Sequence, residues 1–162
     1  IVAASRSKLI SQVRIHNAAI KILEATDLEN LVEVVTTDLA NILDLEVSAL
    51  CVEGDDPSII LPDITNVHTL EPGMVDYIMG HHRKVVLRTK TRADRIVFEG
   101  AFNLVKSVVL LRLPLSKNGP MALLALGAQK EIKIHPGQGT ELITFLSQVL
   151  TNRMRFWLSF PF

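Results

Sequence analysis

The chain has 162 residues, and its 17 basic and 17 acidic side chains give a formal net charge of zero at pH 7. This length fits one folded domain, and because the charge is balanced we do not expect nucleic acid as a partner. Apolar residues make up 48% of the chain, which is enough for a packed core, but Arg112 and Pro114 interrupt the most apolar segment, so we expect no membrane span. The one cysteine, Cys51, excludes an internal disulfide and fits a reducing, cytoplasmic compartment.

The first 25 residues predict a helix. Its apolar positions recur at intervals of four and three, which is the spacing of a short heptad seam. The seam would pack either on the C-terminal helix of the same domain or on a second copy of the chain, and the sequence leaves both open. We therefore divide the chain into an N-terminal helix (1–25), a main domain (26–158) and a tail (159–162). The seam consists of Leu9, Val13, His16, Ile20 and Leu23.

A second helix is expected to run to about Leu43. Thr26 and Glu29 have the spacing of a capping box, and Asp27 adds negative charge at the start of the helix. The inward positions would be Leu28, Leu31, Val32, Val35, Leu39 and Ile42.

Three strands are predicted before residue 90. They are Glu46–Glu53, Ile59–Leu61 and Lys84–Thr89, each rich in branched apolar residues or bounded by turn residues. Cys51 lies in the middle of the first strand, where a small buried side chain is the plainer interpretation and a reactive thiol the alternative.

Two short helical segments lie beside these strands in the sequence. Glu71–Met79 predicts a helix that Gly80 ends. Residues Asp94–Asn103 predict a loop or short helix that carries Phe98 and Phe102 over whatever lies beneath.

The last third predicts a hairpin followed by a long helix. Ser107–Leu115 and Met121–Ala128 are apolar runs joined by the turn residues Lys117–Pro120. From Thr140, apolar residues recur at helical spacing through Leu150. The fold class expected is α+β: an antiparallel sheet of about five to six strands, helices mainly on one face, and long N- and C-terminal helices.

This order of elements resembles the GAF fold of small-molecule sensory domains. Three segments also resemble the bacterial GAF-like family known as domain of unknown function 484 (DUF484): Ser107–Leu115 (SVVLLRLPL), Leu123–Gly127 (LLALG) and Ile134–Thr140 (IHPGQGT). The likeness covers about Asp27 to Met154. The family is functionally uncharacterised, so the resemblance implies a fold, a regulatory role and a homodimer formed through the terminal helices, but no reaction. This sequence departs from the family pattern at Ala122, Ala128, Ile134 and Gln138.

No motif for chemistry is found. His81 and His82 are adjacent, and together with His68 and His135 they lack metal-ligand spacing. The chain has no Gly-x-Ser-x-Gly elbow and no glycine-rich phosphate loop. We therefore expect neither an enzyme, nor a metal, nor a cofactor.

A ligand pocket between the sheet and residues 83–102 is the main functional hypothesis. Acidic residues dominate between Ile22 and His82, whereas basic residues dominate from Arg83 onward, so an anionic ligand would fit. The alternative is that the aromatic residues are ordinary core, the arginines a solvated face, and the domain a protein-interaction and homodimerisation module without ligand. The candidate residues are Tyr77, Met79, Arg88, Arg92, Phe98 and Phe102.

Overall fold

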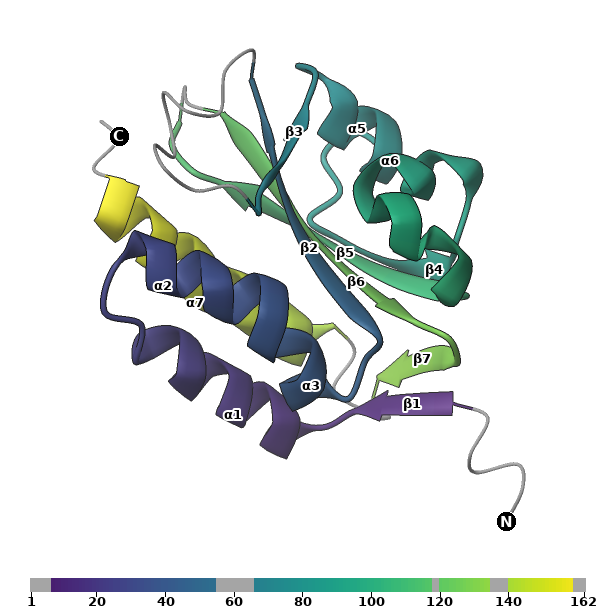
Figure 1. Cartoon of the computed structure of the whole chain (residues 1–162), viewed down its shortest axis with the longest axis horizontal. Helices are drawn as coiled ribbons and strands as arrows, with labels where there is room; N and C mark the ends of the chain where they lie inside the picture. Colours follow the sequence, from purple (N-terminus) through teal and green to yellow (C-terminus); the bar gives the residue numbers. More distant parts are fainter. Residues whose placement is uncertain (1–6, 55–65, 118–119, 135–139, 159–162) are drawn as a thin grey trace.

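The computed structural model describes residues 7–54, 66–117, 120–134 and 140–158. Its centre is a twisted five-stranded sheet with helices on both faces (Figure 1). The strands lie in the order β3-β2-β6-β5-β4. Their bounds are β2 Val47–Glu53, β3 His68–Leu70, β4 Val85–Thr89, β5 Ser107–Pro114 and β6 Met121–Ala128.

The predicted hairpin is confirmed. Strands β5 and β6 pair antiparallel over their whole length, from Ser107 opposite Ala128 to Pro114 opposite Met121. The predicted first and third strands are also present, since β2 pairs antiparallel with β6 and β4 with β5. The expected α+β fold class is therefore correct.

Strand β3 was not predicted, and its direction differs from that of the expected antiparallel sheet. It pairs parallel with β2, with Cys51 opposite His68, so the sheet is mixed rather than wholly antiparallel. A parallel neighbour needs a long return connection, and the chain between Glu53 and His68 is long enough to supply it. The predicted strand Ile59–Leu61 lies outside the described residues.

One face of the sheet carries the longer helices (Figure 1). None of the helices in the described ranges is long and apolar enough to cross a bilayer. The long C-terminal helix is confirmed. The elements on this face are α1 Gln12–Leu23, α2 Leu28–Glu33, a π-helical turn Val34–Asp38, α3 Leu39–Leu43 and α7 Glu141–Leu158.

The N-terminal segment is not helical throughout. Ser7–Ile10 forms β1, which pairs parallel with β7 (Glu131–Ile134) in a separate two-stranded sheet. Helix α1 starts only after Ser11, whose side chain accepts a hydrogen bond from the Arg14 backbone N–H. Prediction of one continuous helix was therefore wrong. Both short strands are stabilised by a partner more than a hundred residues away, which local periodicity does not reveal.

Helix α2 is capped one residue later than predicted. The Asp27 carboxylate, not the Thr26 hydroxyl, accepts the hydrogen bond from the Asn30 backbone N–H at 2.7 Å. The Asn30 side-chain oxygen accepts in turn from the Thr26 N–H at 3.1 Å. The prediction of a capped helix start is thus correct, but the N-cap residue is Asp27 rather than Thr26. The negative charge of Asp27 also interacts favourably with the helix dipole.

The opposite face is covered by shorter helices. We call residues 74–104 the covering segment, and it returns through β4 between its helical parts (Figure 1). These parts are α5 Met74–Met79, a 3-10 turn Arg92–Asp94, α6 Arg95–Phe98 and a 3-10 turn Glu99–Leu104.

The sheet separates two apolar cores. The first core lies under the longer helices and includes Val109 and Leu111, whereas the second lies under the covering segment and includes Val108 and Leu110. Successive residues of a strand point to opposite faces, so burial on both faces explains why β5 and β6 are apolar almost throughout.

Candidate functional site

The covering segment and the second core hold most of the predicted site residues. Met79, Phe98 and Phe102 lie together in this core, with exposures of 4%, 4% and 8%. Tyr77 is 70% exposed on the outside of α5, and Arg92 is exposed on the 3-10 turn before α6. The structure thus brings three of the six residues together as packed apolar side chains, and it leaves two at the surface.

Arg88, the sixth residue, is held by a carboxylate that sequence analysis did not name. Its Nη1 donates to Asp94 Oδ2 at 2.6 Å and its Nη2 to Asp94 Oδ1 at 3.0 Å. Nη2 also lies 3.2 Å from the Ile78 carbonyl oxygen at the end of α5. Asp94 is fully buried. Arg88 therefore connects β4 to the end of α5 and to the 3-10 turn before α6.

Asp94 has a second role, which a sequence signal could have revealed. Its Oδ2 accepts a hydrogen bond from the Thr91 backbone N–H at 2.8 Å, and the Thr91 side chain caps the turn in return. Thr91 and Asp94 thus form a capping box, whose threonine-to-acid spacing of three is visible in the sequence.

Arg112 makes a similar connection from β5. Its Nε donates to the Arg83 carbonyl at 2.7 Å and its Nη2 to the Gly80 carbonyl at 2.9 Å. Its Nη1 donates to Asp76 Oδ1 at 2.6 Å, and this hydrogen bond is the main reason that the pKa of Asp76 is lowered. The one charge within an otherwise apolar strand is thus used to fix the turn between α5 and β4.

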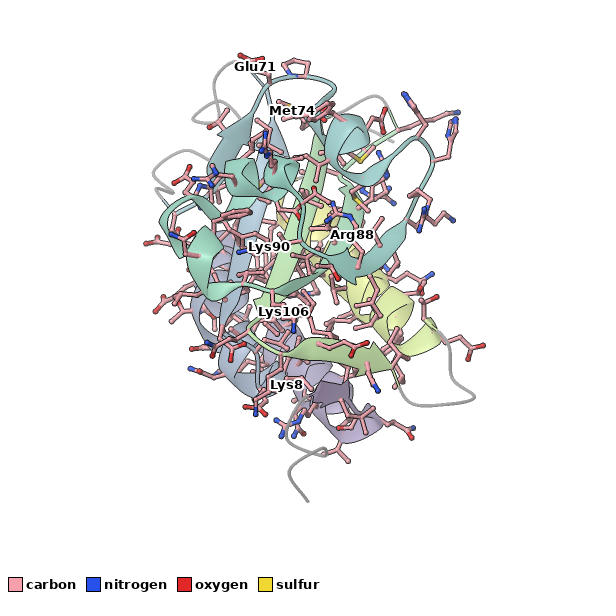
Figure 2. All side chains as sticks on the ribbon, turned by 90° about the vertical axis from the view of Figure 1, so that its right-hand side faces the viewer. Lys8, Glu71, Met74, Arg88, Lys90 and Lys106 are labelled. Atoms are coloured by element: carbon pink, nitrogen blue, oxygen red, sulfur yellow. The ribbon has the colours of Figure 1, made fainter. Side chains whose placement is uncertain are left out.

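The basic residues near Phe102 also have partners within the domain. Lys90 Nζ donates to the Phe102 carbonyl at 3.0 Å and lies 4.2 Å from the centre of the Phe102 ring. The Arg95 guanidinium lies 4.7 Å from the same ring. Figure 2, which faces the covering segment, labels Arg88 and Lys90 at this site. Cation–π contacts of this kind stabilise the segment on its own core.

A cavity of about 440 Å³ opens where β4 ends. Two of its lining residues, Lys90 and Lys106, are labelled in Figure 2. Among the described residues, neither a carboxylate nor a histidine lines it, so these residues supply no acid–base pair. The lining residues are Thr89, Lys90, Asn103, Leu104, Val105, Lys106 and Gln129.

The groups that could carry covalent or metal chemistry are placed unfavourably for it. Cys51 is fully buried, and burial raises the pKa of its thiol to about 12, so it is not a thiolate nucleophile at neutral pH. His68 Nδ1 lies 3.0 Å from Glu99 Oε1 at the surface. Across the described ranges, no group of three or more His, Cys, Asp or Glu side chains could hold a metal ion. His135 lies outside those ranges.

The predicted heptad seam faces away from the domain. Helix α1 packs on the first core through other residues, namely Ile15, Ala18, Ala19 and Ile22. Leu9, Val13, Ile20 and Leu23 are 47%, 68%, 44% and 51% exposed, and His16 between them is exposed as well. We call these five residues the α1 stripe, although Leu9 lies in β1, just before the helix. Helix α1 does pack beside α7 of its own domain, which is one of the two alternatives left open by the sequence, but it does so through residues other than the predicted seam.

Comparison with known families shows to which family the chain belongs. The model of a family described as "Protein of unknown function, DUF484" matches residues 2–159. The chain belongs to this family. The match covers nearly the whole chain, so the resemblance recognised in the hairpin and in the segment before α7 is confirmed. A search of the curated proteins finds no match.

Two solved structures share the fold of this DUF484 chain. One is the GAF domain of a phosphoenolpyruvate-protein phosphotransferase from Acinetobacter, with a TM-score of 0.60, 10% identity and coverage of 92% of this chain and 95% of that one. The other is the chromophore-binding domain of a bacteriophytochrome from R. palustris, with a TM-score of 0.56, 10% identity and coverage of 89% of this chain and 61% of that one. The GAF-like fold is therefore established.

Proposed function

We propose that this chain is a non-catalytic regulatory domain that acts by pairing with a second copy of itself through its terminal helices. The observation that carries the proposal is the α1 stripe, since Val13, Ile20 and Leu23 lie exposed on a helix whose other face is already buried, and Leu9 is exposed on the strand just before it. A DUF484 chain with a GAF-like fold fits a regulatory role.

The physical argument is the cost of leaving this stripe in water. Burying a large aliphatic side chain contributes roughly 1.5–3 kcal/mol. In a two-fold pair the same stripe of both copies lies in the interface, so each residue of the stripe contributes two buried side chains, one from each copy. Spacing of four and three residues allows the side chains of two helices to interdigitate along their length.

The C-terminal helix offers further apolar surface. Phe145 is 49% and Phe156 is 64% exposed on α7. Phe156 packs edge-on against Trp157 with ring centres 5.0 Å apart, and Arg153 lies over both rings. Among the described residues, the Nε of Arg153 and the Nε1 of Trp157 have no hydrogen-bond partner.

A ligand under the covering segment is the second candidate function. One structural neighbour is described as a chromophore-binding domain, which favours it. Met79, Phe98 and Phe102 fill this space in the structure, so a ligand would enter only if these side chains moved. Arg88 would also have to leave Asp94 before it could bind an anion.

Sedimentation equilibrium tests the self-association. We expect the wild type to be a dimer and Val13→Glu/Ile20→Glu to be a monomer with an unchanged circular dichroism spectrum. Lys21→Glu is the control, because Lys21 is exposed on α1 outside the stripe. A monomeric wild type, or a double variant that stays dimeric, would contradict the proposal. Native mass spectra of the same samples test the second candidate, since a bound ligand adds releasable mass.

A further inference from the structure

One member of the α1 stripe is not apolar. On helix α1 the stripe continues with Val13, His16, Ile20 and Leu23, so a titratable imidazole lies between large apolar side chains. His16 is exposed, as the other stripe residues are. Residues three and four apart lie side by side on a helix, so a partner helix that covers Val13 and Ile20 also covers the side chain between them. Self-association alone gives no reason for a histidine at this position.

Among the described residues, the His16 side chain has no polar partner, neither a hydrogen bond nor an ion pair. The cationic side chains of α1, Arg14 and Lys21, project from positions about 160° and 140° around the helix from it. Arg14 is turned toward the end of α3, where its Nη1 donates to the Ile42 carbonyl at 3.3 Å. Glu24, at the end of α1, lies about 12 Å further along the helix axis. His16 therefore decides alone whether the helical part of the stripe carries a charge.

The elements packed beside α1 supply no ion pair for His16 either. These elements are α3, the π-helical turn before it, and α7. Their charged side chains, with that of the residue after α3, are Asp38, Asp44, Glu141, Arg153 and Arg155. Asp44 is engaged by Lys8 at 3.0 Å and lies 3.9 Å from Arg14. Within the described ranges, a positive charge on His16 is therefore stabilised by water and not by a carboxylate.

Pairing through the α1 stripe would remove that water. In a parallel two-fold pair His16 meets its own counterpart, and in an antiparallel pair with the helical parts of the stripes fully overlapped it meets Ile20 of the second copy. In both arrangements the neutral imidazole can lie among apolar side chains, whereas the charged form loses its hydration. In the parallel arrangement two like charges would also face each other. Protonation of His16 therefore opposes pairing in either orientation.

From this placement we infer that His16 makes the self-association of this chain reversible by pH: two chains pair while His16 is neutral and separate when it takes up a proton. Histidine is the side chain whose charge ordinarily changes between pH 5 and 8, so mild acidification is sufficient. Because separated chains bind more protons than the pair, the dissociation constant of the dimer rises as the pH falls. The inference rests on the proposed function, since it concerns the regulation of the same surface.

Sedimentation equilibrium at pH 8 and pH 5.5, at one ionic strength, tests the inference. We expect the dissociation constant of the wild type to be at least about tenfold higher at pH 5.5, with an unchanged circular dichroism spectrum. An unchanged constant, or loss of helical signal in place of dissociation, would overturn the inference and leave the self-association at pH 8 standing. A wild type that is monomeric at both pH values would contradict the proposed function, and the inference would fall with it.

Matched histidine variants identify the group that titrates. His16→Gln stays uncharged at both pH values, so its dissociation constant should change by less than about twofold. His16→Leu completes the apolar stripe and should pair more tightly than the wild type at both pH values. His81→Gln is the control, because His81 is exposed on the turn between α5 and β4, and it should keep the pH dependence of the wild type. Full pH dependence in His16→Gln, or its loss in His81→Gln, would overturn the inference.

Discussion

The guanidinium of Arg88 and the carboxylate of Asp94 form a two-point ion pair, with N–O distances of 2.6 and 3.0 Å, on the face of the sheet under the covering segment. Asp94 is fully buried, and it also caps the turn that leads into α6. The arginine that sequence analysis assigned to a ligand is therefore engaged by the protein itself. This pair joins β4, the 3-10 turn and the end of α5 in one network.

Breaking this pair should destabilise the domain. Asp94→Ala leaves the Arg88 charge without its partner and the Thr91 N–H without its acceptor, so we expect the free energy of unfolding to fall by about 3 kcal/mol. Urea unfolding measures it. Arg92→Ala, at an exposed position, should change stability by less than about 0.5 kcal/mol. The double variant Arg88→Ala/Asp94→Ala should lose less than the sum of the single losses, and strict additivity would contradict the pairing.

Phe98 and Tyr77 separate core packing from ligand contact among the predicted site residues. Phe98 is 4% exposed and Tyr77 is 70% exposed. Phe98→Ala should lower the free energy of unfolding by about 3–5 kcal/mol, because it leaves a cavity in the second core. Tyr77→Ala should change it by less than about 0.5 kcal/mol. Similar urea midpoints for the two variants would show that Phe98 does not support the core.

The elements that could be predicted are those with a strong local signal. The hairpin of β5 and β6 has two apolar runs around turn residues, and α7 has apolar residues at helical spacing. These signals are independent of the rest of the chain. The resemblance to the DUF484 family was found in the same region for the same reason.

The elements that were missed depend on distant partners. Residues 7–10 form a strand only because Glu131–Ile134 lies beside them. On α1 we predicted one apolar seam, but the domain buries a different face, with Ile15, Ala18, Ala19 and Ile22, because periodicity alone does not show which face the core will cover. The sequence also did not reveal the ion pair between Arg88 and Asp94. We assigned Arg88 to a ligand because the position of Asp94 beside it was not known.

Cys51 should be unreactive in the folded chain. Burial raises the pKa of its thiol to about 12, and the side chain has no exposed surface. Ellman's reagent at pH 8 should therefore modify it at least about a hundredfold more slowly in buffer than in denaturant, because only the thiolate reacts. Rapid, stoichiometric modification of the folded protein would contradict this placement. The denatured sample is the control for reagent and thiol integrity.

Asp44 provides a test of stability against pH. Asp44 follows α3 and has a left-handed backbone conformation, with φ of 58°, and its Oδ2 is 3.0 Å from Lys8 Nζ. This hydrogen bond from Lys8 is the first cause of its lowered pKa, whose usual value is 3.8. Because the pKa is lower in the folded chain, the stabilisation is fully present above pH 3.8 and is lost as the pH falls through the folded value.

The size of this contribution is limited by solvent, since the Asp44 side chain is 53% exposed. We expect Asp44→Asn to cost up to about 1 kcal/mol near neutral pH. Asparagine tolerates the left-handed backbone, so the change removes the charge and little else. Urea unfolding at pH 7 and pH 3 should show the difference between wild type and variant shrinking in acid. Glu33→Gln, at an exposed position on α2, is the control. A difference that grew on acidification would contradict the ion pair between β1 and the end of α3.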